Sequence, residues 1–141
     1  MIGKTFKYTD FDGIEREETH YFHIFEYEMM DLELATPGGF RKKLDRISKA
    51  VDIPELNKTF KELVAMSYGR KSADGRSFSK KPEYFEEFMA TEAYSQLMMT
   101  VLTDTNYAIE FLKGIMPKKL NAEQEQQLNN EIAKHPALKH H

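Results

Sequence analysis

The first residues of the chain alternate between apolar and polar side chains, as expected for a β-strand with one buried face. Phe6 and Tyr8 would point to one side, and the residues between and around them would point to the other. Asp12-Gly13 follows, and this dipeptide is the strongest short signal for a two-residue hairpin turn. The pattern therefore predicts a β-hairpin over residues 3–24.

A two-residue turn at Asp12-Gly13 would also fix which residues of the two strands face each other. Phe11 would then oppose Ile14, and Lys7 would oppose Glu18 as a pair of opposite charge. We expect the free edge of this hairpin to allow self-association, because its outer backbone groups can pair with a strand of another chain. The predicted apolar face consists of Phe6, Tyr8, Thr19 and Tyr21.

From residue 25 onward the apolar residues recur at intervals of three and four, which is the period of an α-helix. Pro37-Gly38-Gly39 would end the first helix, and Asp52 with Glu55 would begin another as a variant of the capping box. Thr91 is expected at the N-terminus of a later helix, and Pro117 would end the last one. One predicted helical stripe consists of Phe40, Leu44, Ile47 and Val51.

These elements predict an α+β fold that is mostly α, with an N-terminal β-hairpin followed by about six short helices. The hairpin and the helical region over residues 25–117 would together form one domain, residues 1–117. Residues 118–141 would form a polar C-terminal tail, in part helical and loosely held, because only Leu128 and Ile132 are apolar on its helical stretch.

The composition narrows the functional classes. The chain has 141 residues, no cysteine and a net charge of −3. Without cysteine it has neither a disulfide, nor a thiolate zinc site, nor a thiol nucleophile. No apolar run approaches the ~20 residues that a membrane span needs. We therefore expect no membrane partner and a place in the cytoplasm.

No motif for catalysis, a cofactor or a metal is evident. His20 and His23 would point to opposite faces of a strand and could not share one ion. Gly38-Gly39 lacks the lysine and hydroxyl of a phosphate-binding loop. The acidic run over residues 15–18 is not paired with a histidine or lysine in a pattern that tunes a pKa. The sequence predicts a protein that is not an enzyme and that needs no cofactor or metal.

A polar loop is predicted over residues 70–81, where five basic residues accompany one acidic residue, Asp74. Phe78 adds an aromatic ring among the bases, as in surfaces that bind single-stranded nucleic acid. The net negative charge of the chain makes a protein the better partner for this loop, and a small nucleic-acid-binding regulator remains the alternative. The five bases are Arg70, Lys71, Arg76, Lys80 and Lys81.

Four stretches of the sequence resemble the tail assembly chaperones of long-tailed, siphovirus-type bacteriophages. They are YTDFDG at residues 8–13, SYGRKSADGRSF at 67–78, FMATEAYS at 88–95 and FLKGIMP at 111–117. A single short motif has a high risk of a chance match, whereas these four follow one another in the order that the family would show.

The resemblance implies a non-catalytic phage tail assembly chaperone. Such a protein would bind the tape-measure protein and recruit subunits of the major tail tube protein in the host cytoplasm, and it would be absent from the mature virion. In related phages a ribosomal frameshift extends some copies, and Lys118-Lys119 is compatible with a slippery run of adenines. The first alternative is another morphogenesis component, such as a head–tail completion protein, which would stay in the virion.

Eight methionines and an aromatic content of 12% suit a surface that adapts to a long client. The positions that we predict to bind a partner are aromatic, methionine and basic residues within or beside the matching stretches. They are Tyr68, Arg70, Lys71, Arg76, Phe78, Tyr84, Phe85, Phe88, Tyr94, Met98 and Met99.

Overall fold

The computed structural model describes residues 1–117, and the predicted tail over residues 118–141 lies outside this part. The described residues form two compact units. Unit 1 contains residues 1–23 and 61–115, and unit 2 contains residues 24–60 and 116–117. The helix α3 (Ile53–Ser67) belongs in part to each unit.

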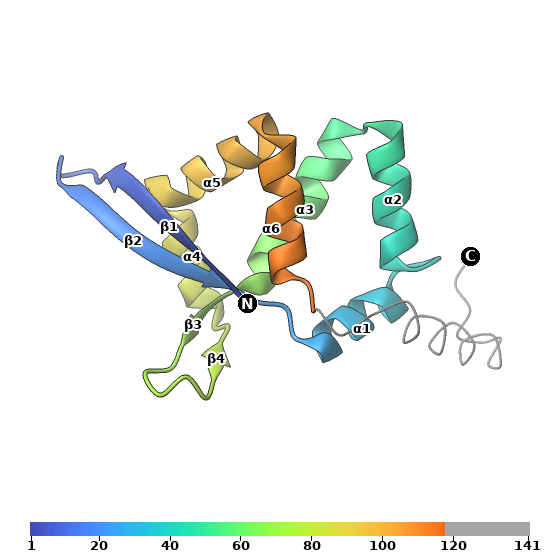
Figure 1. Ribbon diagram of the computed structural model, residues 1–141, viewed down its shortest axis with the longest axis horizontal. Coiled ribbons are helices and arrows are strands. Elements are labelled where there is room, and N and C mark those ends of the chain that lie inside the picture. Colours follow the sequence, from blue (N-terminus) through green and yellow to red (C-terminus); the bar gives the residue numbers. More distant parts are fainter. Residues whose placement is uncertain (118–141) are drawn as a thin grey trace. The chain divides into compact units, whose positions relative to one another are not determined.

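Unit 1 begins with the predicted hairpin, which is formed by β1 (Ile2–Thr9) and β2 (Glu15–Phe22) (Figure 1). The predicted register is wrong by one residue, because Phe6 faces Glu18 and Lys7 faces Glu17. A shift of one residue turns every side chain of a strand to the other face. Thr19 and Tyr21 therefore lie opposite the face that holds Phe6, and His20 and Phe22 share that face instead.

The turn explains this register. Asp10 and Ile14 close a three-residue loop through a backbone hydrogen bond of 2.8 Å from the Asp10 N–H to the Ile14 carbonyl. The Asp10 carboxylate also accepts the N–H groups of Asp12 and Ile14, each at 2.9 Å. Gly13 takes the left-handed conformation, with φ of +80°, that a three-residue loop of this kind requires. The side chain of Asp10 therefore selects a longer turn than the Asp-Gly dipeptide alone predicts.

Two short strands extend the hairpin to a four-stranded antiparallel sheet of order β1-β2-β3-β4. They are β3 (Tyr68–Lys71) and β4 (Phe78–Ser79), so the ends of the predicted loop over residues 70–81 are paired strands. The turn between them is closed by a hydrogen bond of 2.9 Å from the Ser72 N–H to the Ser77 carbonyl. Prediction missed this second hairpin because its strands are short and mostly polar.

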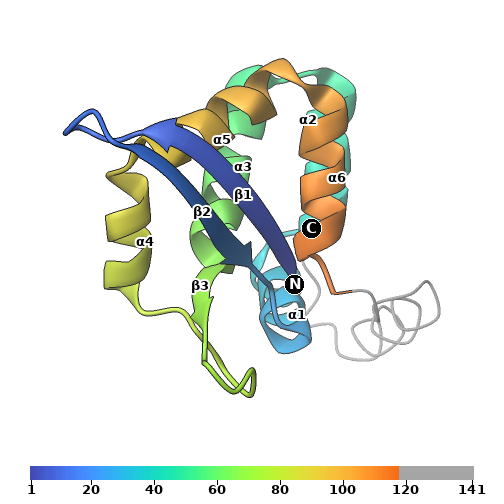
Figure 2. The ribbon, with the colours of Figure 1, turned by 60° about the vertical axis from the view of Figure 1, so that its left-hand side comes forward.

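Three further helices complete unit 1: α4 (Pro82–Met89), α5 (Glu92–Thr103) and α6 (Thr105–Ile115). They pack on one face of the sheet (Figure 2), where α4 contacts β3 and both α5 and α6 contact β1. Asp104 begins α6 by accepting the Tyr107 N–H at 3.1 Å. Gly114 is needed where α6 meets the sheet, because a side chain there would collide with Ile2.

The core of unit 1 is aromatic. The ring of Phe22 meets those of Tyr68, Phe88 and Phe111 at centroid distances of 5.0–5.9 Å, all edge to face. Phe6 adds a further ring, 6.0 Å from that of Phe88. These side chains join both hairpins to the helices in one buried cluster.

Unit 2 contains α1 (Glu26–Ala35) and α2 (Phe40–Ala50), which contact each other. The predicted break at Pro37-Gly38-Gly39 is confirmed, and both glycines take positive φ angles, of +78° and +92°. Asp52 begins α3 as predicted, because its carboxylate accepts the Glu55 N–H at 3.3 Å. Val51 does not continue the stripe of α2, since it is exposed and takes a left-handed φ of +52° just after the helix ends.

Candidate functional site

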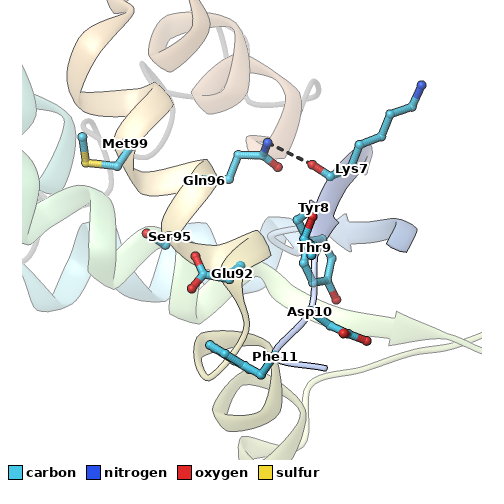
Figure 3. A pocket seen from close by; sticks show the side chains of 9 residues that line it. All are labelled: Lys7, Tyr8, Thr9, Asp10, Phe11, Glu92, Ser95, Gln96 and Met99. Atoms are coloured by element: carbon cyan, nitrogen blue, oxygen red, sulfur yellow. Dashed lines mark hydrogen bonds between the residues drawn. The ribbon is translucent and has the colours of Figure 1, made fainter. Parts of the chain in front are cut away.

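An open groove lies between the end of β1 and the first turns of α5 in unit 1 (Figure 3). Its volume is about 450 Å³, and backbone from the hairpin turn forms one wall while α5 forms the other. Its lining combines polar groups with three large apolar or aromatic side chains. The lining residues are Lys7, Tyr8, Thr9, Asp10, Phe11, Glu92, Ser95, Gln96 and Met99.

The β1 wall of this groove is a sheet edge. Because Asp10 and Ile14 are a hydrogen-bonded pair, the alternation of an antiparallel ladder turns the backbone groups of Thr5, Lys7 and Thr9 away from β2. The side-chain amide of Gln96 donates to the Lys7 carbonyl at 3.2 Å, which confirms this direction. The groove therefore offers backbone donors and acceptors beside an apolar surface.

Two exposed apolar side chains flank the groove. Phe11 is 81% exposed at the tip of the hairpin, and Met99 is 57% exposed on α5. Met99 is one of the predicted contact residues, whereas prediction missed Phe11. Its exposure could have been predicted from the sequence, because a phenylalanine between two aspartates in a hairpin turn lies too far from the core to be buried. Exposed apolar groups beside a concave surface are typical of sites that bind proteins.

Two of the predicted contact residues lie in the core. Tyr68 and Phe88 are only 4% and 1% exposed, and their rings stack at a centroid distance of 4.5 Å with an interplanar angle of 6°. Both residues were predicted to bind a partner, but their burial leaves neither side chain at the surface of unit 1. Tyr68 belongs to the central strand β3 and Phe88 to the inner side of α4, so each packs between the sheet and the helices.

Other predicted aromatic positions are half-buried around this stack. Phe85 lies 6.1 Å from Tyr68 and 5.9 Å from Tyr94, measured between ring centroids. Tyr84 is covered by basic side chains, and Met98 is half-buried on α5 beside the exposed Met99.

The basic residues of the second hairpin differ in how many contacts they make with neighbouring side chains. Arg70 lies over the ring of Tyr84, 4.1 Å from its centroid, and forms an ion pair with Glu87. Lys71 lies 4.9 Å from the ring centroid of Tyr21 on the other face of the sheet. The hydrogen bond to Glu87 raises the pKa of Arg70 above its usual value. Arg70 is therefore already ion-paired within the fold, while Arg76 is exposed.

A chain of hydrogen bonds on the helix-covered face links Tyr8, Glu18, His20 and Tyr68. The Tyr8 hydroxyl donates to Glu18 at 2.6 Å, and the two ring nitrogens of His20 lie 3.2 Å from Glu18 and 2.8 Å from the Tyr68 hydroxyl. The expectation that no acidic residue of the run over residues 15–18 is paired with a histidine is therefore wrong. Positions 18 and 20 share a face because they are two apart on a strand.

This chain of contacts shifts three pKa values. The hydrogen bond to Glu18 and the burial of the ring raise the pKa of Tyr8 to about 12. The same hydrogen bond lowers the pKa of Glu18. Burial lowers the pKa of His20, although the contact with Glu18 opposes that change. His20 is thus held mainly neutral in the fold at pH 7, as a structural link between β2 and β3.

A family model described as phage tail assembly chaperone matches residues 1–140 of the chain. The chain belongs to the phage tail assembly chaperone family. Neither a curated protein nor a solved structure matches it. The predicted family is thereby confirmed. The match covers more of the chain than the four stretches that carried the resemblance.

For a tail assembly chaperone, the expected partners are proteins of the phage tail, met in the host cell while the tail is assembled. Chaperones of this kind are generally non-catalytic. Within residues 1–117, no helix is long and apolar enough to span a membrane. The same part of the chain holds no group of three or more His, Asp or Glu side chains arranged to bind a metal ion.

Proposed function

We propose that this tail assembly chaperone binds the tape-measure protein through the groove between β1 and α5 and recruits subunits of the tail tube to it. It acts in the host cytoplasm and leaves before the virion is complete. The groove carries this proposal, because Phe11 and Met99 present apolar surface on both of its sides in a chain with a mean hydropathy of −0.63.

The chemistry of the groove suits a client that has not yet reached its final structure. Apolar side chains can bind exposed apolar residues of the client, and methionine adapts to side chains of different shapes. Polar groups such as Gln96 and the Thr9 backbone can bind its backbone. Many such weak contacts along one long client give strong overall binding without any catalytic step.

Two further positions predicted to bind a partner remain part of the proposal, the exposed Arg76 and the half-buried Phe78. Arg76 and Phe78 lie on the second hairpin, away from the groove, and would meet a second tail protein or another part of the client. Self-association through the edge of β1 also remains a prediction, and it would compete with a client strand at the same backbone groups.

The groove is tested by placing a charge in it. Met99→Glu should weaken capture of the tape-measure protein at least about tenfold, as expected when an apolar contact within an interface is replaced by a charge. Met89→Glu is the matched control, because Met89 is a similarly exposed methionine on α4 outside the groove. The measurement is the amount of tape-measure protein retained by tagged chaperone after co-expression.

Equal retention by Met99→Glu, Met89→Glu and the unaltered chain would remove the groove from the proposal while leaving the family intact. Mass spectrometry of purified virions tests the other half of the proposal. The chaperone should be absent from the particles, and its presence there in amounts comparable to tail proteins would contradict the proposed role.

A further inference from the structure

The two edges of the sheet differ in how they are protected. At one edge, β4 has two residues and is followed closely by Lys80, Lys81 and Pro82. Short strands, lysine and proline are the usual means by which proteins keep a sheet edge from pairing with another chain. At the other edge, β1 has eight residues and no proline, and one of its two lysines, Lys4, lies over the ring of Tyr107. The edge of β1 is therefore the less protected of the two.

The backbone of β1 presents a regular row of pairing groups at this edge. Every second residue directs its N–H and C=O groups away from β2, at Thr5, Lys7 and Thr9. Successive residues of this row are about 6.8 Å apart, which is the repeat at which a neighbouring strand offers its own donors and acceptors. An extended polypeptide is the class of ligand that matches such a row, since a helix has already paired its own backbone groups.

The side chain of Gln96 occupies one group of this row (Figure 3). It reaches over from α5, and its amide donates to the Lys7 carbonyl at 3.2 Å. The same carbonyl would accept an N–H group from an added strand. Because Gln96 is exposed, its side chain can turn away into water and keep its own amide hydrogen-bonded there. Gln96 thus holds the position of a backbone donor that a partner would supply.

The side chains of an added strand would meet two different surfaces. Residues aligned with Lys7 and Thr9 would face the open side of the sheet, and the residues between them would face α5. On α5 the groove is lined by Met99, and Leu102, three positions further along the helix, is also about half exposed. A segment with apolar residues at alternate positions therefore fits this edge, with polar or acidic residues between them, beside Lys7.

We propose that an extended segment of a partner protein binds as a fifth strand at the edge of β1, with apolar side chains at alternate positions facing α5. This inference rests on the proposed function, because it uses the same groove, and it specifies how the backbone of the client is recognised. Backbone pairing requires no particular side chain, so one edge can bind many segments of a long client. A second copy of the chain is the poorer occupant, since pairing of two β1 edges centred on Lys7 would oppose two lysines.

Amide hydrogen exchange of the full chain, followed residue by residue with NMR, tests the pairing directly. The probes are overlapping peptides, longer than a typical strand of about 5–6 residues, that cover the tail proteins encoded in the same phage genome. Without peptide, the N–H groups of Lys7 and Thr9 should exchange faster than those of Phe6 and Tyr8, which pair with β2. A bound peptide should slow exchange at Lys7 and Thr9 at least about tenfold and leave the Glu17 N–H unchanged, because that group points away from β1.

Two proline variants separate this edge from the rest of the hairpin. Lys7→Pro removes an outward N–H group and places a ring at the edge, so it should weaken peptide binding at least about tenfold. Glu17→Pro is the matched control, because Glu17 faces Lys7 across the hairpin while its N–H group points to the other side of β2. Both Glu17→Pro and Lys7→Ala should bind peptides as the parent chain does, and undiminished binding by Lys7→Pro would overturn the proposal. If both proline variants unfold, the exchange measurement on the parent chain decides.

Gln96 allows a test in which the expected effect has the opposite sign. Gln96→Ala removes the competing donor, so it should strengthen peptide binding about threefold, whereas loss of an ordinary contact residue would weaken it. The control is Asn106→Ala on α6, which removes another exposed amide outside the groove and should have no effect. Weaker binding by Gln96→Ala would contradict its displacement by an added strand.

The outcomes distinguish this inference from the proposed function. Peptides that bind less well to Met99→Glu, but do not slow exchange at Lys7 and Thr9, would overturn the added strand and leave the groove in place. Slower exchange at both residues with equal binding to Met99→Glu would uphold the strand and remove Met99 from the proposed function. The inference is also overturned if no peptide binds, or if exchange at Lys7 slows merely when the chain itself is concentrated, since a second copy would then be the occupant.

Discussion

The two hairpins of the sheet differ in the length of their turns and in how they are stabilised. Each has an Asp-Gly dipeptide in its turn, and the glycines have φ angles of +80° and +74°. In the first hairpin, strands of eight residues bury Phe6 and Phe22 against the helices. The second hairpin has strands of four and two residues, and from it only Tyr68 and Gly69 are buried.

This difference shows which parts of the sheet can carry exposed charged side chains. Both hairpins are fixed at their bases by the aromatic cluster, and both turns are shaped by hydrogen bonds of Asp10 or of Ser72 and Asp74. The turns therefore need no apolar side chain for stability. They can hold exposed carboxylates in one hairpin and exposed bases in the other without cost to the core.

A substitution in the aromatic cluster at the shared base of the two hairpins should have the largest effect on stability. Phe88→Ala removes the ring that stacks on Tyr68 and meets Phe22, so it should lower the free energy of unfolding by about 3–5 kcal/mol, measured with urea. Met89→Ala, on the exposed side of the same helix, should stay within ~0.5 kcal/mol of the parent chain. Equal losses in the two variants would contradict the aromatic cluster as the common anchor.

A smaller loss of stability is expected from a substitution that affects the second hairpin more than the first. An added Cβ at Gly69 would lie 2.5 Å from the Phe78 ring and 2.6 Å from the Ser79 carbonyl oxygen. Gly69→Ala should therefore cost about 1–3 kcal/mol. Hydrogen exchange should accelerate at the Ser72 N–H in the second hairpin and much less at the Asp10 N–H in the first. Uniform acceleration would show that the hairpins open together; Ser77→Ala is the control.

The pH dependence of stability should reveal the link between β2 and β3. Because burial lowers the pKa of His20, the unfolded chain binds a proton at a higher pH than the folded chain does. The contribution of His20 to stability is therefore complete above its unfolded pKa of about 6.5 and is lost as the pH falls toward the folded pKa. His20→Phe should reduce the loss of stability between pH 7.5 and 5.5 in urea unfolding, whereas an unchanged slope would contradict this assignment.

The smallest effect is expected at the surface of the second hairpin. A double-mutant cycle of Arg70→Ala and Glu87→Ala should give a coupling energy of no more than about 1 kcal/mol, because the pair is about half exposed. Arg70→Ala alone should cost more than Glu87→Ala, since it also removes the contact with Tyr84. Coupling that persists unchanged in 1 M salt would contradict an exposed pair.

Much of the fold could be predicted from local signals. The first hairpin, the break at Pro37-Gly38-Gly39 and the cap at Asp52 all depend on residues close together in the sequence. The register of the hairpin was missed because the Asp10 side chain, outside the Asp-Gly dipeptide, sets the length of the turn. The strands β3 and β4 were missed because they are too short for alternation to show.

The candidate site was less accessible to prediction. Met99 was predicted as a contact from its residue type, but the groove depends on α5 packing beside β1, which lies about ninety positions earlier in the chain. Burial of Tyr68 and Phe88 likewise follows from packing between distant elements. The pairing of Glu18 with His20 could have been predicted from the sequence, since residues two apart on a strand share a face.

Co-expression with the tape-measure protein of the same phage genome, followed by affinity capture and size-exclusion chromatography, tests the central claim most directly. The account predicts that the chaperone keeps the tape-measure protein soluble and elutes with it. The complex should also retain the tail tube protein when all three are expressed together. A tape-measure protein that stays insoluble and is not retained by the chaperone would contradict the proposed function.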